Sequence, residues 1–145
     1  MRLKTRSGLL AAATLAFGLW PVLAHAAIDI TRTEASGAES SISSCASQFQ
    51  GKPLIECVGS ALEALSGGLG KGNISSVAAR VASVTATVAG QVRQAATKTV
   101  AVSVLNRASS IVSGLAAQST GEAQQVYSRV GQVYARAISV INSKG

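Results

Sequence analysis

Apolar side chains recur every three or four residues along two stretches in the second half of the chain. A step of three or four places side chains on one face of an α-helix, so both stretches predict amphipathic helices. Between residues 74 and 95 the stripe consists of Val77, Val81, Val84, Val88, Val92 and Ala95. Between residues 121 and 142 it consists of Val126, Val130, Val133, Ala137 and Val140.

Local signals indicate where these two helices begin. Asn73 is a favourable N-cap for a helix that starts at residue 74. Ser119 is followed three residues later by Glu122, which is the spacing of a capping box. The last helix is therefore expected to begin at about Gly121.

The pattern between the two helices is ambiguous. Apolar residues from Ala101 through Ile111 to Leu115 have helical spacing, but they point nearly opposite to the stripe of residues 77–95. In residues 99–104, valines also alternate with smaller or polar residues, as in a β-strand. Three structures are compatible: a continuous helix with partners on both sides, a helix that kinks or breaks near 99–104, and a short strand. We favour a helix with a kink or break, because an isolated strand has no evident pairing partner.

A shorter helical hairpin is predicted before these helices. Ser36 and Glu39 have capping-box spacing and are expected to open its first helix. Pro53 suits the first turn of its second helix, and Gly67 and Gly68 are expected to end it. The predicted order is a flexible N-terminal segment (27–36), the hairpin (37–66), a glycine-rich joint (67–73) and a helical domain (74–145).

The chain has two cysteines, Cys45 and Cys57, and each falls on the apolar face of its predicted helix. In an exported protein such a pair is expected to form a disulfide. A loop of this length stabilises a fold by roughly 3 kcal/mol in the chain-entropy model. Redox pairs usually lie closer together, as in Cys-x-x-Cys, so we interpret this pair as a staple across the hairpin.

The first 26 residues have the pattern of a signal peptide. Three basic residues precede an apolar stretch over residues 8–23, and Ala24 and Ala26 are the small residues that signal peptidase requires. Cleavage is expected between Ala26 and Ala27. The apolar stretch is shorter than the ~20 residues of a spanning helix, and Pro21 interrupts it, which argues against an uncleaved anchor. The mature protein is expected to be exported, periplasmic or extracellular, from a bacterium.

Cleavage changes the charge of the protein. The formal net charge falls from +7 to +4, with −3 in residues 27–70 and +7 in residues 71–145. A basic excess favours anionic partners, such as an anionic membrane surface or an acidic polysaccharide. Export and the lack of a basic cluster with interleaved aromatics argue against nucleic acid.

The mature chain lacks the usual residues of catalysis. The one His of the chain leaves with the signal peptide, so the serines have no usual base. Glu56 and Glu63 lie two turns apart and are typical of a solvated helix face. The glycine-rich joint departs from the phosphate-loop pattern, and no metal-binding motif is present. We therefore expect no enzymatic activity, no catalytic residue, no metal and no cofactor.

The last helix offers the best candidate for an interaction surface. Tyr127 and Tyr134 are seven residues apart and share one side of the helix. We expect them to flank the core with their hydroxyls in water, while a ligand-stacking pair is the alternative. Arg129 and Arg136 lie on the polar face of the same helix and complete this candidate surface.

These patterns predict an all-α protein: a small helical bundle after signal-peptide removal, with a disulfide-stapled hairpin followed by two longer amphipathic stretches. The expected function is that of an exported, non-enzymatic protein acting by protein–protein interaction or self-assembly. The opposed stripes of residues 77–95 and 101–115 motivate this, since one thin bundle cannot cover both. The alternatives are a membrane-active, bacteriocin-like factor and a binder of an anionic envelope polymer.

Overall fold

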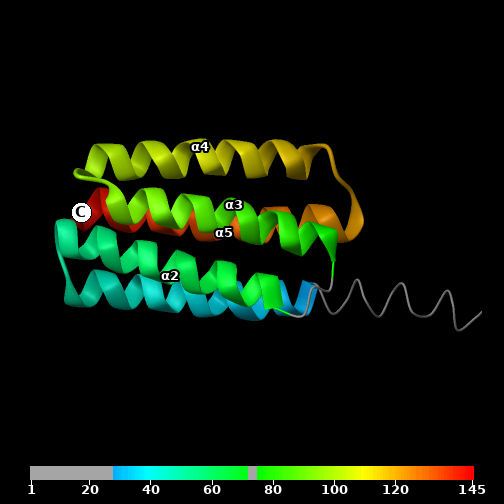
Figure 1. Ribbon diagram of the computed structural model, residues 1–145, viewed down its shortest axis with the longest axis horizontal. Helices are drawn as coiled ribbons and strands as arrows, with labels where there is room; N and C mark the ends of the chain where they lie inside the picture. Colours follow the sequence, from blue (N-terminus) through cyan, green and yellow to red (C-terminus); the bar gives the residue numbers. More distant parts are fainter. Residues whose placement is uncertain (1–27, 72–74) are drawn as a thin grey trace, which may run out of the picture.

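The structure is a computed structural model that describes residues 28–71 and 75–145. Within those residues the protein is a bundle of helices without β-strands, as the sequence predicted (Figure 1). A first helix spans residues 28–48 and is called helix 28–48 below. It is followed by α2 (Lys52–Gly70), α3 (Ser76–Gln94), α4 (Lys98–Ala117) and α5 (Gly121–Lys144).

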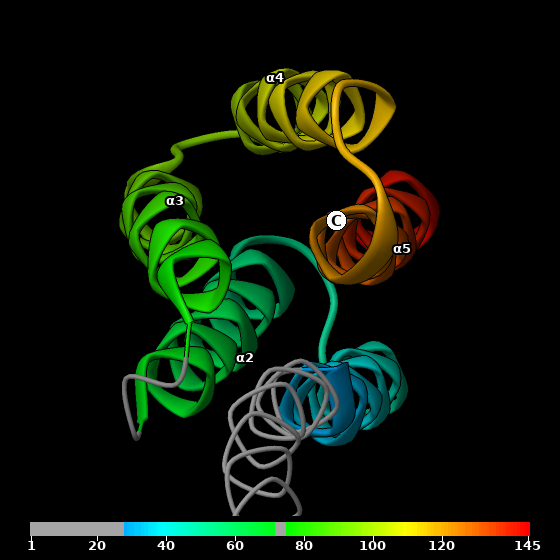
Figure 2. The same ribbon diagram turned by 90° about the vertical axis from the view of Figure 1, so that its right-hand side faces the viewer.

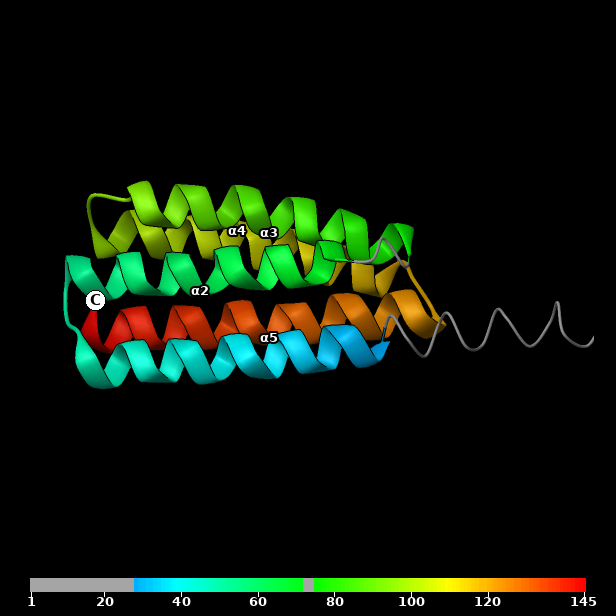
Figure 3. The ribbon, with the colours of Figure 1, turned by 60° about the horizontal axis from the view of Figure 1, so that its bottom comes forward.

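Consecutive helices run antiparallel because short connections join them. Viewed along the bundle, they follow one another around a ring, with α4 between α3 and α5 (Figure 2). Helix 28–48 and α5 lie side by side and close the ring (Figure 3). The apolar faces meet in one core rich in Val and Ala, which also contains larger side chains. The largest fully buried side chains include Tyr134, Ile42, Leu54, Ile55, Leu62, Leu65, Leu69, Leu105 and Ile141.

The break between α3 and α4 falls at residues 95–97, slightly before the predicted position. Thr97 caps α4, and its hydroxyl accepts a hydrogen bond from the Val100 amide at 3.3 Å. Residues 99–104 are therefore helical, and their strand-like alternation is incidental. The opposed stripes have a simple cause, since each belongs to a separate helix that turns its own face toward the core.

The prediction that Ser36 begins a helix after a flexible segment is wrong. Helix 28–48 runs without interruption through these residues, and Ala35 is fully buried. Ser36 and Glu39 instead contact Arg129 of α5. The two polar side chains with capping-box spacing thus bind a neighbouring helix instead of capping their own. The helix continues through the residues before them.

The prediction that Gly67 and Gly68 end a helix is also wrong, because α2 continues to Gly70. A Cβ atom at Gly68 would collide with the side chain of Glu34, so this glycine allows helix 28–48 to approach α2 closely. Leu69 is buried in the core and holds the last turn in place. The expected position of Pro53 in the first turn of α2 is confirmed.

Two further predicted helix starts differ from the structure. Asn73 lies outside the described residues, and α3 is capped by Ser75, whose hydroxyl accepts from the Ala78 amide at 3.0 Å. The N-cap of α5 is Thr120 without a side-chain bond, so the Ser119–Glu122 capping box does not form. Gly121 turns the chain there with a φ of 62°, a left-handed conformation that favours glycine. The predicted signal peptide, with Ala24, Ala26 and Ala27, lies outside the described residues.

Candidate functional site

The predicted staple is confirmed. A disulfide joins Cys45 of helix 28–48 to Cys57 of α2, with 5.8 Å between their Cα atoms. Cys45 is buried at the packed face of the two helices. The bond fixes the end of the bundle at which helix 28–48 turns into α2.

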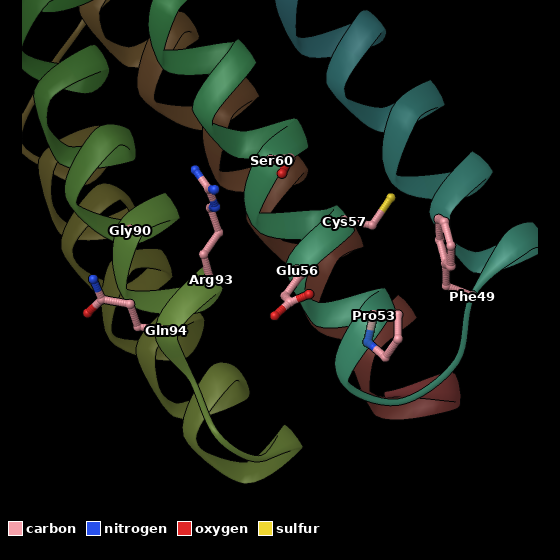
Figure 4. A pocket seen from close by; sticks show the side chains of 8 residues that line it. All are labelled: Phe49, Pro53, Glu56, Cys57, Ser60, Gly90, Arg93 and Gln94. Atoms are coloured by element: carbon pink, nitrogen blue, oxygen red, sulfur yellow. The ribbon is translucent and has the colours of Figure 1, made fainter.

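An open cavity of about 860 Å³ lies beside the disulfide, between the end of helix 28–48, α2 and α3 (Figure 4). Its charged side chains are already paired. Lys52 contacts Glu56 at 3.3 Å, and Arg93 forms an ion pair with Glu63. The aliphatic part of the Arg93 side chain lies directly against Gly59. The residues that line the cavity are Phe49, Pro53, Glu56, Cys57, Ser60, Gly90, Arg93 and Gln94.

Two cations beside this cavity link α3 to α2. Lys52 also donates to the backbone carbonyl of Arg93 at 3.3 Å, so both cations tie α3 to α2. In Figure 4 the labelled side chains come from α3, from α2 and from the connection at Phe49, and they do not converge on a common point. No described residue in its lining pairs a nucleophile with a base in the manner that covalent catalysis requires.

The candidate surface on α5 does not form as predicted. Tyr134 is fully buried, and its hydroxyl lies 2.6 Å from the Thr85 hydroxyl of α3. Burial raises the pKa of Tyr134, although the bond to Thr85 opposes that shift. Tyr127 is buried as well. The two tyrosines are core residues because α5 lies between helix 28–48 and α4 in the ring, and its inner face meets α3 at the Tyr134–Thr85 contact.

Arg129 is engaged within the bundle. Its guanidinium contacts both carboxylate oxygens of Glu39, at 2.8 and 3.3 Å, and the Ser36 hydroxyl at 3.3 Å. The hydrogen bond from Arg129 lowers the pKa of Glu39, burial opposes this, and the charges of Arg129 and Arg136 add to the lowering. Arg129 thus joins α5 to helix 28–48, and of the four predicted surface residues only Arg136 is exposed.

Two of the three large hydrophobic side chains that are exposed among the described residues lie on α4. Only four of the twenty residues of α4 are buried: Ala101, Leu105, Ala108 and Val112. Val100 and Ile111 are 47% and 48% exposed. Ile111 belongs to the predicted apolar stripe of residues 101–115 and stays half exposed, because the apolar band of α4 is wider than its contact with the bundle.

A groove of about 320 Å³ follows this surface along the seam between α3 and α4. Val88 and Ala108 form buried parts of its lining, and Ile111 stands exposed at its edge. Arg107 also lines the groove, and none of the four ion pairs among the described residues includes it. The full lining is Ser83, Val84, Thr87, Val88, Gln91, Val104, Arg107, Ala108 and Ile111.

The groove residues were missed by the sequence analysis, although two signals pointed to them. The apolar band from Ala101 to Leu115 includes the neighbours Ile111 and Val112, which cannot both face one narrow contact. Residues 71–121 contain five basic residues and no carboxylate. Their basic side chains can therefore find acidic partners only in other parts of the chain or in another molecule.

Two further properties of the described residues bear on function. By length and composition, α4 is the one described helix that could cross a membrane. Core helices of soluble proteins meet the same criterion, but such helices are mostly buried, whereas α4 is mostly exposed. Across residues 28–71 and 75–145, no three His, Cys, Asp or Glu side chains gather into a possible metal site.

Similarity to known proteins assigns neither a family nor an activity to the chain. Comparison with models of protein families, with curated proteins and with solved structures finds no match.

Proposed function

We propose that this chain is an exported, non-enzymatic helical protein that binds another protein through the groove between α3 and α4. The observation that carries the proposal is the low burial of α4, which hides four of twenty residues, whereas α2 hides eight of nineteen. Apolar side chains that remain exposed beside a groove are typical of an interaction surface.

The contacts between helices support this choice of seam. Arg93 of α3 pairs with Glu63 of α2, and Arg129 of α5 pairs with Glu39 of helix 28–48. Lys98 of α4 donates to the Asn142 carbonyl of α5. Between the described residues of α3 and α4, no side-chain hydrogen bond or ion pair is present. The seam between helix 28–48 and α2 also has no such polar contact among the described residues, but the Cys45–Cys57 disulfide closes it, so the α3–α4 seam has neither kind of link.

Export and the lack of enzymatic activity are parts of the same proposal. The signal-peptide pattern of residues 1–26 supports a periplasmic or extracellular location. The mature chain would contain no His, and the carboxylates of Glu39, Glu56 and Glu63 already have cationic partners. These residues leave little for acid–base catalysis to use.

Site-specific photo-cross-linking tests the proposed surface. A photoreactive residue at position 111 should give a discrete protein adduct in the native cell envelope. The same residue at position 136, which is exposed on α5, should give none. Equal adducts at both positions, or none at either, would refute the groove as the interaction surface. An adduct between two copies of this chain would still identify the groove as the interaction surface and would indicate self-assembly.

Binding to an anionic membrane is the second candidate function, favoured by the length and composition of α4. A flat bilayer would contact Val100 and Ile111 but would not reach the buried Val88 and Ala108 in the groove. The shape of the surface therefore favours a protein partner. An anionic polymer is a weaker candidate, because Arg93 and Arg129 are engaged by carboxylates of the bundle.

A further inference from the structure

We propose that the partner presents an amphipathic helix to the α3–α4 groove, with a carboxylate opposite Arg107. This inference rests on the proposed function and specifies the chemistry of the partner. It follows from the shape of the groove, from its charge and from the poor fit of other occupants.

The shape of the groove fits a helix. Its walls are two antiparallel helices whose lining residues recur at steps of three and four, from Ser83 to Gln91 on α3 and from Val104 to Ile111 on α4. At 1.5 Å per residue, each wall is about 10–12 Å long, or roughly two turns of a helix. A seam between two helices is a common docking site for the apolar face of a third.

The charge of the groove specifies the polar side of that helix. Arg107 lines the groove, and residues 71–121 contain no Asp or Glu that could neutralise it. The other polar groups of the lining, Ser83, Thr87 and Gln91, are uncharged. A carboxylate at the edge of the docked helix would form a charge-assisted hydrogen bond with the guanidinium. A cationic helix would instead meet like charge.

A second copy of this chain is a poor occupant. Packing α4 against α4 of another copy about a two-fold axis at its middle would bring the two Arg107 side chains together. The acidic helices of a second copy are helix 28–48 and α2, whose apolar faces are already buried. Two of their carboxylates, Glu39 and Glu63, already hold arginines.

The N-terminal 27 residues of the chain are a poor occupant for the same electrostatic reason. They contain three basic residues and no carboxylate, so they offer no partner to Arg107. Charge complementarity therefore favours a helix of another protein.

Two designed peptides test this inference. Each is an alanine-based helix of about 18 residues with a leucine stripe at helical spacing. One carries glutamates beside the stripe, and the matched peptide carries lysines at the same positions. Fluorescence anisotropy measures their binding to the mature chain with its disulfide intact. We expect the glutamate peptide to bind about fivefold more tightly, as one exposed ion pair allows.

Variants assign the preference to the groove. Arg107→Glu should reverse it, and Arg107→Gln should abolish it, while circular dichroism verifies the fold. Ile111→Ser should weaken the binding of both peptides. Arg136→Glu makes the same charge change on exposed α5 and should leave the preference intact. Equal binding of both peptides, or a preference unchanged in Arg107→Glu, would overturn the inference.

Two other results would also overturn it. In the first, the mature chain binds vesicles of phosphatidylglycerol and phosphatidylcholine but neither peptide, and Ile111→Ser abolishes the vesicle binding. The second is a dimer in sedimentation that Ile111→Ser dissociates. If cross-linking from position 111 still captures a protein while the peptides show no preference, the proposed function stands and only the acidic helix is wrong.

Discussion

Helices α2 and α4 have nearly the same length, yet the fold uses them differently. Of the nineteen residues of α2, eight are buried, and a disulfide and an ion pair attach this helix to its neighbours. Only four of the twenty residues of α4 are buried, and α4 lies at the edge of the bundle opposite helix 28–48 (Figure 2). Apolar content alone therefore does not determine burial. A helix is buried where it has neighbours on several sides, and the excess apolar surface of an outer helix remains available to a partner.

Truncation of one large apolar side chain in each helix is the strongest test of this contrast. Leu62 of α2 is fully buried, so Leu62→Ala should lower the free energy of unfolding by about 2–5 kcal/mol. Ile111→Ala removes a half-exposed side chain and should cost less than about 1 kcal/mol. Urea titration measures both values. Similar losses would show that α4 is packed as tightly as α2.

Removal of the disulfide tests the stapled side of the molecule. The Cys45→Ser/Cys57→Ser double variant should lose roughly 3 kcal/mol of stability, because the unfolded chain regains the freedom of the closed loop. Chemical denaturation measures the loss, with the reduced wild-type protein as its control. The position-111 cross-link should persist in the folded variant, since the groove is formed by α3 and α4. Loss of the cross-link in a folded variant would show that the groove depends on the disulfide.

The buried hydroxyl pair tests the contact between α3 and α5. Tyr134→Phe leaves the Thr85 hydroxyl without its partner and should cost about 1–3 kcal/mol. The Tyr134→Phe/Thr85→Val double variant removes both groups and should recover part of the loss. Because burial raises the pKa of Tyr134, this site stabilises the fold below the ordinary pKa of 10.0, and that contribution is lost as the pH rises through the folded pKa. The Tyr134→Phe protein should therefore lose less stability at alkaline pH than the wild type. An equally steep loss in both proteins would contradict this.

The ion pair between α5 and helix 28–48 should give the smallest effect. Glu39→Gln should cost about 1 kcal/mol at neutral pH, since the pair is partly exposed to solvent. The pKa of Glu39 is lowered, so its contribution is present above the ordinary value of 4.5 and is lost as the pH falls through the folded pKa. Denaturation at several acidic pH values should show a weaker pH dependence for the variant. A difference that grows toward low pH has the wrong sign.

The helices and the staple could be predicted from the sequence because their signals are local. The stripe from Val77 to Val92 became one face of α3, with Ala95 just past its end, and the stripe from Val126 to Val140 became one face of α5. The two cysteines allowed one pairing within the chain, and it formed. Helix ends were less predictable, because Ser36 and Gly68 have local preferences that a tertiary contact overrode.

The candidate surface required the tertiary structure. Tyr134 and Ile111 both lie in apolar bands of amphipathic helices, yet one is fully buried and the other is half exposed. The sequence by itself determined the helical periodicity, the cysteine pair and the division of charge between the two halves. Only the packing decided that α5 buries both tyrosines and that α4 keeps Ile111 half exposed. The physical reason is that periodicity specifies which face of a helix is apolar, whereas burial depends on how many neighbouring helices cover that face.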